Sequence, residues 1–307
     1  MKVLVVGNRG QVGLELMRAA WPQGTQLVGL ARPQIDITEP VSIDAALTRH
    51  APDVVINGAA YTAVDKAESD RANAFAVNAT GPASLAAACV RHGSTLVHLS
   101  TDYVFDGSAS RSYREDDPVV PINVYGESKA AGEAAVRLQQ PRHIILRTSW
   151  VYAAHGQNFV RTMLRLASER DKISVVADQH GAPTSAGDIA AAIVAVTKKL
   201  INDTPRAASF GTFHFTAGGD TTWYGFAEQI IRHYADARGR APLLEPITTS
   251  AFPAPARRPV NSLLDCSRIQ SVFQVRCPPW RESLAHVVED LLATSDASTA
   301  QQSSAAS

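Results

Sequence analysis

The feature that most constrains the fold is a glycine-rich turn directly after an apolar run at the start of the chain. Residues Lys2 to Val6 are predicted to form a strand, and a helical pattern of apolar residues begins at Leu14. Between them glycine occupies every third position, Gly7, Gly10 and Gly13. A strand, a glycine turn and a helix in this order let the backbone approach a pyrophosphate closely. The sequence therefore predicts a dinucleotide-binding unit.

Four further apolar runs of strand length follow, separated by helix-patterned segments. They span Leu27 to Leu30, Asp53 to Asn57, Thr95 to Leu99 and His143 to Arg147. Such strand and helix repeats are typical of a doubly wound parallel sheet, because parallel strands need a crossover helix between them. We therefore predict an α/β chain with a Rossmann domain at residues 1–150.

The chain changes character beyond residue 150. Apolar segments become shorter, and turn-rich pieces separate them: Gln179 to Ser185, Ala217 to Thr222 and Pro253 to Pro259. We predict a smaller, mixed α/β substrate domain at residues 151–293, interleaved with the last strands of the sheet. Residues 294–307 are rich in Ser, Ala, Gln and Thr, so they are predicted to form a disordered tail.

Composition excludes several classes of function. The 307 residues contain 29 Lys and Arg and 29 Asp and Glu, so no bulk charge attracts nucleic acid or an anionic membrane. No apolar run approaches the roughly 18 residues of a membrane span, and no secretion signal precedes the first strand. We expect a cytoplasmic protein. Cys89, Cys266 and Cys277 are odd in number, far apart in sequence and without metal-ligand spacing, so we assign them no role.

A candidate proton-transfer pair lies in the segment Asn123 to Glu133. On a helix, Tyr125 and Lys129 would lie four residues apart on one face. A nearby cation favours the phenolate and would lower the pKa of the phenol toward neutral pH, which suits acid–base work. Taken alone, however, Tyr125 and Lys129 are better explained as an aromatic residue and a lysine on a solvated helix, without a catalytic role.

The sequence upstream favours a catalytic role instead. The apolar run that begins at Thr95 ends in Ser100, Thr101 and Asp102. A buried parallel strand delivers such side chains to a site at the carboxyl edge of the sheet. We therefore predict that the Thr101 hydroxyl, the Tyr125 phenol and the Lys129 ammonium form one group at this edge of the sheet.

Other residues are predicted to hold the dinucleotide through the backbone. In the glycine turn, Gln11 and Val12 complete the predicted cofactor contacts. After the third strand come Ala59, Ala60 and Tyr61, where small residues let a cofactor lie close to the main chain.

The end of the second strand bears on the choice of cofactor. Enzymes restricted to NADH often place an acid there, but this chain has Arg32. A guanidinium suits a 2′-phosphate, so we predict NADPH, with NADH as the alternative cofactor and a surface role as the alternative for Arg32. The nearby Asp36 and Ile37 are predicted to border the adenine.

Seven segments in order resemble the extended short-chain dehydrogenases, and within them the dTDP-4-dehydrorhamnose reductases. The resemblance covers residues 1 to about 292. It rests on Gly7 to Gly13, Asn57 to Glu68, Ser100 to Gly107, Asn123 to Lys129, Arg147 to Tyr152, Gly181 to Thr184 and Ala256 to Ser262.

This resemblance implies reduction of the 4-keto group of dTDP-4-dehydro-L-rhamnose to dTDP-L-rhamnose, a donor for bacterial surface polysaccharides such as lipopolysaccharide. It implies that Thr101, Tyr125 and Lys129 are catalytic, and that Tyr125 and Lys129 also contact the cofactor. It further implies that Thr62, Asp102 and Trp150 contact the dTDP-sugar. The flat face of Trp150 would suit a 6-deoxy sugar, with a core tryptophan as the alternative. The guanidinium of Arg258 fits a diphosphate, with a solvated basic residue as the alternative.

Some members of the family form a dimer through a magnesium ion held by acidic residues. Glu15 and Asp290 match two of these positions, whereas Gly187 stands at the third. We therefore predict no Mg²⁺ site, keep Glu15 and Asp290 as candidate ligands, and leave monomer and homodimer open.

Two other functions compete with reduction. A related sugar-nucleotide epimerase or dehydratase would retain NAD and complete an internal redox cycle, but the segments Ser100 to Gly107 and Arg147 to Trp150 argue against it. A non-catalytic, reductase-like regulatory subunit is argued against by the presence of Thr101, Tyr125 and Lys129.

Overall fold

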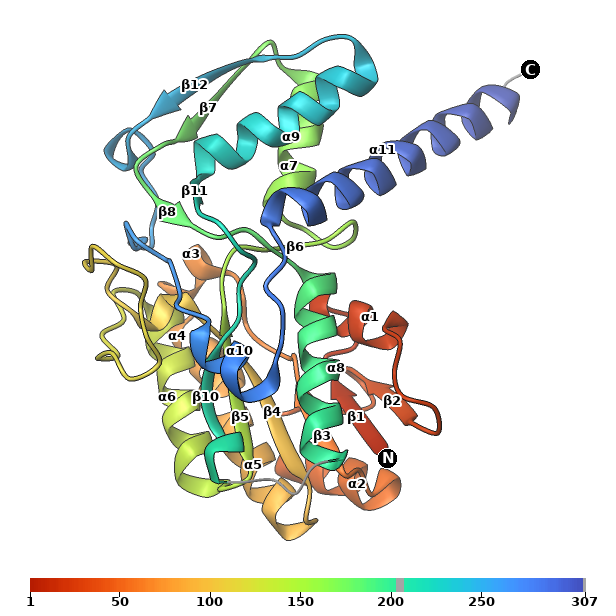
Figure 1. Cartoon of the computed structure of the whole chain (residues 1–307), viewed down its shortest axis with the longest axis vertical. Helices are drawn as coiled ribbons and strands as arrows, with labels where there is room; N and C mark the ends of the chain where they lie inside the picture. Colours follow the sequence, from red (N-terminus) through yellow and green to blue (C-terminus); the bar gives the residue numbers. More distant parts are fainter. Residues whose placement is uncertain (203–206, 306–307) are drawn as a thin grey trace.

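A computed structural model describes residues 1–202 and 207–305, with side chains described for residues 1–201 and 207–293. A sheet of six parallel strands forms its centre (Figure 1), in the order β10-β5-β4-β3-β1-β2. The strands are β1 (Lys2–Val6), β2 (Gln26–Leu30), β3 (Val54–Asn57), β4 (Thr95–Thr101), β5 (His143–Thr148) and β10 (Gly211–His214). The strand order runs outward in both directions from the β1 and β3 pair, which confirms the predicted doubly wound sheet.

Helices cover both faces of this sheet. One face packs on α1 (Gln11–Arg18), α8 (Ala186–Asn202) and α10 (Ser267–Phe273). The other packs on α2 (Pro40–His50), α5 (Gly81–Arg91) and α6 (Val124–Gln139). The strands are buried on both faces, which explains why they read as continuous apolar runs rather than as alternating ones.

From the sequence we expect a helix from about Lys66 to His92 with an interruption at Gly81 and Pro82, but the structure differs. The structure has α3 (Val64–Ala67), α4 (Arg71–Phe75), a π-helical turn η1 (Ala76–Thr80) and then α5. Tertiary contacts surround the π-helical turn. Helix α6 passes so close to η1 that a Cβ on Gly132 would lie within 3.0 Å of the Asn78 carbonyl oxygen. The Asn78 side chain in turn bonds the backbone of Tyr61, at 2.8 and 2.9 Å.

A smaller lobe stands over the carboxyl edge of the sheet (Figure 1). It contains α7 (Phe159–Glu169), α9 (Trp223–Arg238) and α11 (Trp280–Ala305), packed around a core that includes Tyr152, Phe226 and Trp280. Three short strand pairs complete it: β7 (Lys172–Val176) with β12 (Leu243–Ile247), β8 (His180–Gly181) with β11 (Thr221–Thr222), and β6 (Val151–Tyr152) with β9 (Thr184–Ser185). The 3-10 turns are η2 (Asp102–Val104), η3 (Ala207–Ser209) and η4 (Thr249–Ala251).

The chain crosses between the lobes more than once. After β9 it returns to the larger lobe as α8 and β10, and α10 does so again before α11. The domain boundaries at residues 150 and 293 stay predictions. So does the disordered tail at 294–307, because side chains from residue 294 onward and all of residues 306–307 lie outside the described part. In the described part, no helix combines the length and apolar character of a membrane span.

Two of the three cysteines meet despite their separation in sequence. Cys266 and Cys277 lie close enough for each thiol to act on the other, and Cys266 lowers the pKa of Cys277. Cys89 is fully buried in the core, and burial raises its pKa to about 12. Distance along the chain was therefore a poor guide to distance in space.

Candidate active site

The three predicted catalytic residues come together at the carboxyl edge of the sheet. Thr101 is the last residue of β4, and Tyr125 and Lys129 occupy the first two turns of α6. The start of α6 is fixed by Asn123, whose side chain accepts a hydrogen bond from the Gly126 N–H at 2.7 Å. In this arrangement the Thr101 hydroxyl lies close enough to the Tyr125 hydroxyl to act on the pKa of the phenol.

The Thr101 hydroxyl is oriented by its other contacts. It donates to Asp102 Oδ1 at 3.0 Å and accepts from the Tyr103 N–H at 3.2 Å, where it caps the η2 turn. The ring of Tyr103 meets that of Tyr125 edge to face, with centroids 5.5 Å apart. Thr101 and Tyr125 are thus held from several sides.

The prediction that Lys129 lowers the pKa of Tyr125 is wrong. Burial raises the pKa of the phenol to about 12, against the opposing hydrogen bond from Thr101, and the charge of Asp102 adds to the rise. Lys129 is not among the groups that act on the phenol, and its Nζ donates to the Leu99 carbonyl at 2.7 Å. Desolvation is therefore the main cause of the shift in the pKa of Tyr125.

Lys129 is itself buried, with 2% of its surface exposed. Burial lowers the pKa of its ammonium to about 8, while the charge of Glu133, one turn further along α6, opposes this shift. Next to it, burial and then the charge of Lys129 hold the pKa of His98 well below its usual value. His98 Nδ1 lies 3.0 Å from Asn57 Nδ2, so the neutral ring accepts a hydrogen bond there.

Asp102 is a buried carboxylate beside the catalytic group, only 3% exposed. Burial raises its pKa to about 6, although hydrogen bonds from Ser262 and Thr101 favour the charged form. Its Oδ2 atom makes no hydrogen bond of normal geometry with the described residues. A buried oxygen with spare acceptor capacity suits a donor group on a ligand.

The glycine turn fits a dinucleotide. Gly7 has a φ of +84°, and a Cβ there would lie 2.6 Å from the Ala59 N. A Cβ on Gly13 would lie within 3.0 Å of the Gly7 carbonyl oxygen. Helix α1 begins beyond Gly10 without a side-chain cap, so no capping side chain competes with an anion for the N–H groups of its first turn.

A loop that the sequence did not reveal secures this turn. Gln11 Oε1 accepts from Asn158 Nδ2 at 2.9 Å, and the Gln11 carbonyl lies 3.1 Å from His155 Nε2. Asn158 also caps α7 by accepting from the Arg161 N–H at 3.1 Å. The capping position of Asn158 before a helical pattern was the available signal. Val12 lies beside Gln11 and packs against the core.

The predicted backbone contacts after β3 lie next to this turn. Asn57 Oδ1 accepts from the Ala59 N–H at 3.1 Å, and Ala60 follows at intermediate burial. The Tyr61 hydroxyl donates to Asp70 at 3.1 Å. Thr62, predicted to contact the sugar nucleotide, is exposed.

At the end of β2, Arg32 is 72% exposed and lies 3.8 Å from Asp36 Oδ2. The Thr38 N–H and hydroxyl hydrogen-bond Asp36 Oδ1 and hold its pKa below the usual value. The Ile37 side chain is buried in the core and touches Gly81, so only its backbone could border an adenine. An acid therefore does stand near Arg32, although not where the sequence pattern expects it.

Trp150 does not present an open face. Its ring stacks on that of Trp223, with centroids 3.6 Å apart and planes 9° apart. A Cβ on Gly181 would lie closest to Cε2 of Trp150 and 2.6 and 2.7 Å from the two neighbouring ring atoms, which places Gly181 over the opposite face. The expected flat platform is thus covered on both sides, and only the ring edge is left for a ligand. Sequence reasoning missed Trp223.

The guanidinium group of Arg258 is not free to bind a ligand either. Its Nη2 and Nη1 atoms donate to the two carboxylate oxygens of Asp65 at 2.7 and 3.1 Å. This bidentate pair keeps the pKa of Asp65 below its usual value and joins α3 to the segment that follows η4. A diphosphate at Arg258 would have to share the guanidinium with Asp65.

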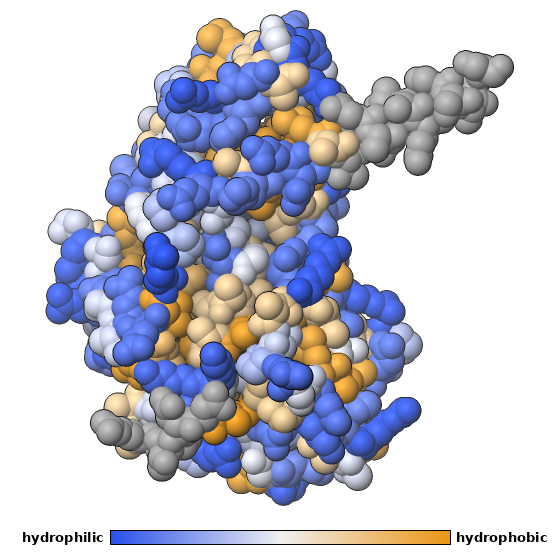
Figure 2. Space-filling view, turned by 45° about the vertical axis from the view of Figure 1, so that its right-hand side comes forward, coloured by the Kyte–Doolittle hydropathy of each residue, from blue (hydrophilic) through white to orange (hydrophobic). Residues whose placement is uncertain are grey.

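The candidate metal ligands lie apart from the catalytic group. Glu15 and Gly187 line a groove of about 510 Å³ between α1 and α8, together with small apolar residues. Figure 2 shows apolar residues gathered on the larger lobe, to which these helices belong. Glu15 lies within ion-pair distance of His155, at 3.3 Å. Asp290 belongs to α11. Among the described residues, no three His, Cys, Asp or Glu side chains are grouped to share a metal ion.

The comparisons agree with this geometry. A family described as "RmlD substrate binding domain" matches residues 1–293. A dTDP-4-dehydrorhamnose reductase of Burkholderia thailandensis is 46% identical, over 95% of this chain and 99% of that protein. A solved dTDP-4-dehydrorhamnose reductase from Clostridium acetobutylicum superposes with a TM-score of 0.88 at 37% identity, covering 95% of this chain and 100% of that one. One from Bacillus anthracis, solved in complex with NADP, gives 0.85 at 36% identity, covering 93% and 98%. The chain belongs to the dTDP-4-dehydrorhamnose reductase family.

Proposed function

We propose that this chain reduces the 4-keto group of dTDP-4-dehydro-L-rhamnose to give dTDP-L-rhamnose, with NADPH as the preferred reductant and NADH as the alternative. The observation that carries the proposal is the meeting of Thr101, Tyr125 and Lys129 beside a turn whose glycines fit a dinucleotide. Homologues named dTDP-4-dehydrorhamnose reductase match nearly the full length of the chain.

NADPH, when bound, supplies the hydride that reduces the keto carbon. The backbone of Gly7, Gly10 and Gly13, with Gln11 and Val12, would hold its pyrophosphate at the start of α1. Ala59, Ala60 and Tyr61 would line its other side. Asp36, Ile37 and Arg32 are proposed for the adenosine end.

Tyr125 is proposed as the proton donor. With a pKa of about 12 the phenol keeps its proton at neutral pH. The oxygen that gains negative charge during reduction is a stronger base than phenolate, so it takes the proton from Tyr125 and becomes the new hydroxyl group. The raised pKa therefore suits donation in the reductive direction. The Thr101 hydroxyl would hydrogen-bond the same oxygen as the charge develops.

Lys129 would act on the phenol once it has given up its proton. An ammonium in a dry site stabilises a neighbouring anion more strongly than one in water. We propose that Lys129 exchanges its bond to the Leu99 carbonyl for contacts to the phenolate and the nicotinamide ribose. This exchange accounts for a buried lysine that carries no fixed carboxylate partner at Nζ among the described contacts.

The sugar nucleotide is proposed to lie between the two lobes. Asp102 Oδ2 would accept from a sugar hydroxyl, and the edge of Trp150 would touch the 6-deoxy position. Thr62 and Arg258 would contact the nucleotide part. We further propose that the reaction takes place in the cytoplasm, without nucleic-acid or membrane partners, and leave monomer and homodimer to measurement.

Substrate choice tests this proposal. We expect the protein to oxidise NADPH with dTDP-4-dehydro-L-rhamnose, and roughly tenfold more slowly with the UDP-linked analogue, since a lost methyl contact costs about that much. Isomerised sugar without net NADPH oxidation would indicate an epimerase instead. Binding of the dTDP-sugar without turnover would indicate a regulatory subunit.

A further inference from the structure

A buried ion pair lies directly behind the catalytic group. Arg147 on β5 and Glu133 on α6 are 1% and 0% exposed. Arg147 Nε and Nη2 donate to the two carboxylate oxygens of Glu133 at 2.8 and 2.7 Å. Burial alone would raise the pKa of Glu133, but the bonds and charge of Arg147 outweigh it and keep the pKa low. Both groups are therefore charged inside the protein.

Stability alone is a weak reason for such a pair. Removing two charges from water costs several kcal/mol, and apolar residues of similar volume often stabilise a fold as well or better. A buried pair that is retained at this cost can instead specify one arrangement of the elements that it joins. The elements joined here are those that carry Thr101, Tyr125 and Lys129.

Glu133 ties the catalytic helix to the catalytic strand. It lies one turn beyond Lys129 and two turns beyond Tyr125 on α6. Its Oε1 atom accepts from the Ser100 hydroxyl at 2.6 Å, and Ser100 immediately precedes Thr101. Arg137 adds a contact to Oε2 at 3.1 Å from the solvent side. The approach of the Thr101 hydroxyl to the Tyr125 hydroxyl therefore depends on how α6 and β4 are aligned, and Glu133 joins the two elements.

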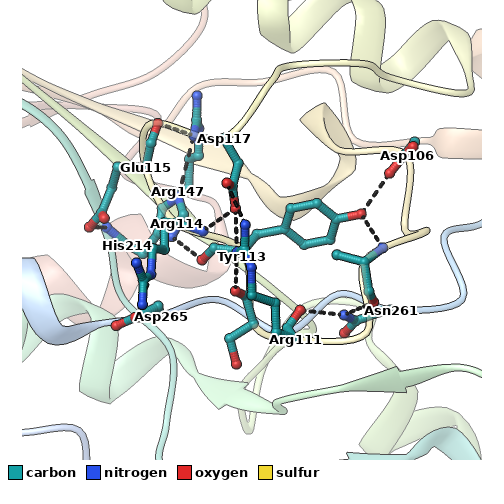
Figure 3. Close-up of polar contacts among 12 residues, drawn as sticks. Asp106, Arg111, Tyr113, Arg114, Glu115, Asp117, Arg147, His214, Asn261 and Asp265 are labelled. Atoms are coloured by element: carbon teal, nitrogen blue, oxygen red, sulfur yellow. Dashed lines mark hydrogen bonds and ion pairs between the residues drawn. The ribbon is translucent and has the colours of Figure 1, made fainter.

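Arg147 ties the same group to the long loop at residues 103–122. Figure 3 shows its guanidinium beside Glu115 and His214. Nη1 donates to the Glu115 carbonyl at 3.3 Å and lies 3.3 Å from His214 Nε2. The guanidinium carbon of Arg147 lies over the Phe105 ring, 5.0 Å from the ring centroid. Every nitrogen of the fork thus has a partner on α6, on the loop or on β10.

His214 extends this connection as a neutral ring. Burial, and then the charge of Arg147, lowers the pKa of His214 to about 3. Since Arg147 can only donate, Nε2 is the acceptor, and Nδ1–H donates to the Tyr113 carbonyl at 3.2 Å. The backbone N–H of His214 donates to Glu115 Oε1 at 3.1 Å. The loop that contributes Tyr103 is therefore held at two carbonyls and one carboxylate (Figure 3).

We infer that Arg147, paired with Glu133, is a positioning residue for the reduction. It holds α6, the end of β4 and the 103–122 loop in the one arrangement that puts the Tyr125 hydroxyl against Thr101. It touches neither substrate nor cofactor and acts through Ser100, Glu133 and Glu115. The inference rests on the proposed function for its kinetic consequence, whereas its structural consequence for the loop is independent of that function.

The test uses the double variant Glu133→Leu with Arg147→Met, which removes both charges together and leaves neither one unpaired in the core. We expect it to fold, to bind NADPH like the wild type, and to lose roughly 10²-fold in kcat with little change in KM, the scale of a 1 Å misplacement. Amide hydrogen exchange in residues 103–122 should accelerate, while β1 and β3 stay protected.

The matched control is Gln140→Leu. Gln140 Nε2 donates to the Ser94 carbonyl at 2.9 Å and joins α6 to β4 at the end away from the site. We expect this variant to lose stability and to keep its kcat. Ser100→Ala is a milder variant that removes one donor from Glu133, and kcat should fall severalfold.

The outcomes are decisive in each case. Wild-type kcat in the folded double variant, or an equal loss of kcat in Gln140→Leu, would overturn the inference. If the double variant did not fold, unchanged kcat and loop exchange in Ser100→Ala would overturn it, and a fall in kcat with faster exchange would support it. Failure of the proposed function would show separately, as no NADPH oxidation by the wild type, and hydrogen exchange would still test the loop.

Discussion

Burial moves three side chains of the site toward their neutral forms. The pKa of Asp102 rises to about 6, that of Tyr125 rises to about 12, and that of Lys129 falls to about 8. Desolvation is the largest cause for each of them, since a charge is stabilised less inside the protein than in water. The site therefore resists gaining charge until a ligand brings a partner for it.

Asp102 makes this resistance measurable as stability. Because its pKa is raised in the folded protein, the Asp102 carboxyl binds a proton more tightly in the folded state than in the unfolded state. Its contribution to stability is therefore lost as the pH rises from about 4 through 6. We therefore compare the free energy of unfolding of Asp102→Asn with that of the wild type at each pH. The difference should favour the variant by about 2 to 3 kcal/mol more at pH 7.5 than at pH 4. Urea denaturation at the two pH values measures the difference.

Asp44 provides a control of opposite sign. Its pKa is lowered, chiefly by a hydrogen bond from Arg91, so the stability that it contributes is present at neutral pH and lost in acid. Asp44→Asn should therefore cost stability at pH 7.5 and less at pH 4. If the Asp102→Asn variant and the wild type differed equally in stability at both pH values, the carboxyl would titrate normally and burial would not act as described.

Arg32 is expected to select the phosphorylated cofactor. A charge-assisted bond to a 2′-phosphate contributes on the order of 1.5 to 3 kcal/mol when well formed and less where water reaches it, and Arg32 is largely exposed. Arg32→Ala should weaken NADPH roughly tenfold and leave NADH nearly unchanged. Titration of both cofactors decides the point, because equal losses or none would make Arg32 a surface residue.

Among the elements, α6 is positioned by two glycines as much as by its apolar face. A Cβ on Gly126 would meet the Tyr103 carbonyl, and one on Gly132 would meet the Asn78 carbonyl of the π-helical turn. Alanine normally favours a helix over glycine, by about 1 kcal/mol. Here the close contacts reverse that preference, because backbone cannot move aside as a side chain can.

We therefore expect Gly132→Ala to destabilise the protein by about 1 to 3 kcal/mol and to lower kcat, as α6 shifts from η1. Gly187→Ala is the matched control in α8, where an added Cβ would have its nearest neighbours at 3.8 and 4.0 Å. This control should be neutral or slightly stabilising. Thermal unfolding of both variants checks the contrast, and a stabilised Gly132→Ala protein would show that the contact between α6 and η1 relaxes freely.

For the whole molecule, local patterns predicted the sheet well. Each strand of the larger lobe up to β5 is a short apolar run, and the glycine turn follows β1 as expected. The meeting of Thr101 with Tyr125 could also be predicted, since parallel strands share one carboxyl edge and residues four apart share one helix face. These inferences need only periodicity and the geometry of parallel sheets.

What the sequence did not reveal depends on residues distant along the chain. Asp65 occupies the fork of Arg258, Trp223 covers Trp150, and Asn158 secures Gln11. Each contact joins the two lobes or two loops across many residues, so no local pattern announces it. The shift in the pKa of Tyr125 was mispredicted for a related reason, because burial, which raises this pKa, is a property of the assembled site.

The most direct test of the central claim compares turnover by Tyr125→Phe and Tyr103→Phe. The two tyrosines lie edge to face, and each substitution keeps the ring and removes one hydroxyl. If Tyr125 donates the proton, NADPH oxidation with dTDP-4-dehydro-L-rhamnose should fall by about 10²-fold or more in Tyr125→Phe, with NADPH binding largely intact. Tyr103→Phe should stay near wild-type turnover. Near wild-type turnover by Tyr125→Phe, or an equal loss in both variants, would contradict the assignment of Tyr125 as the proton donor.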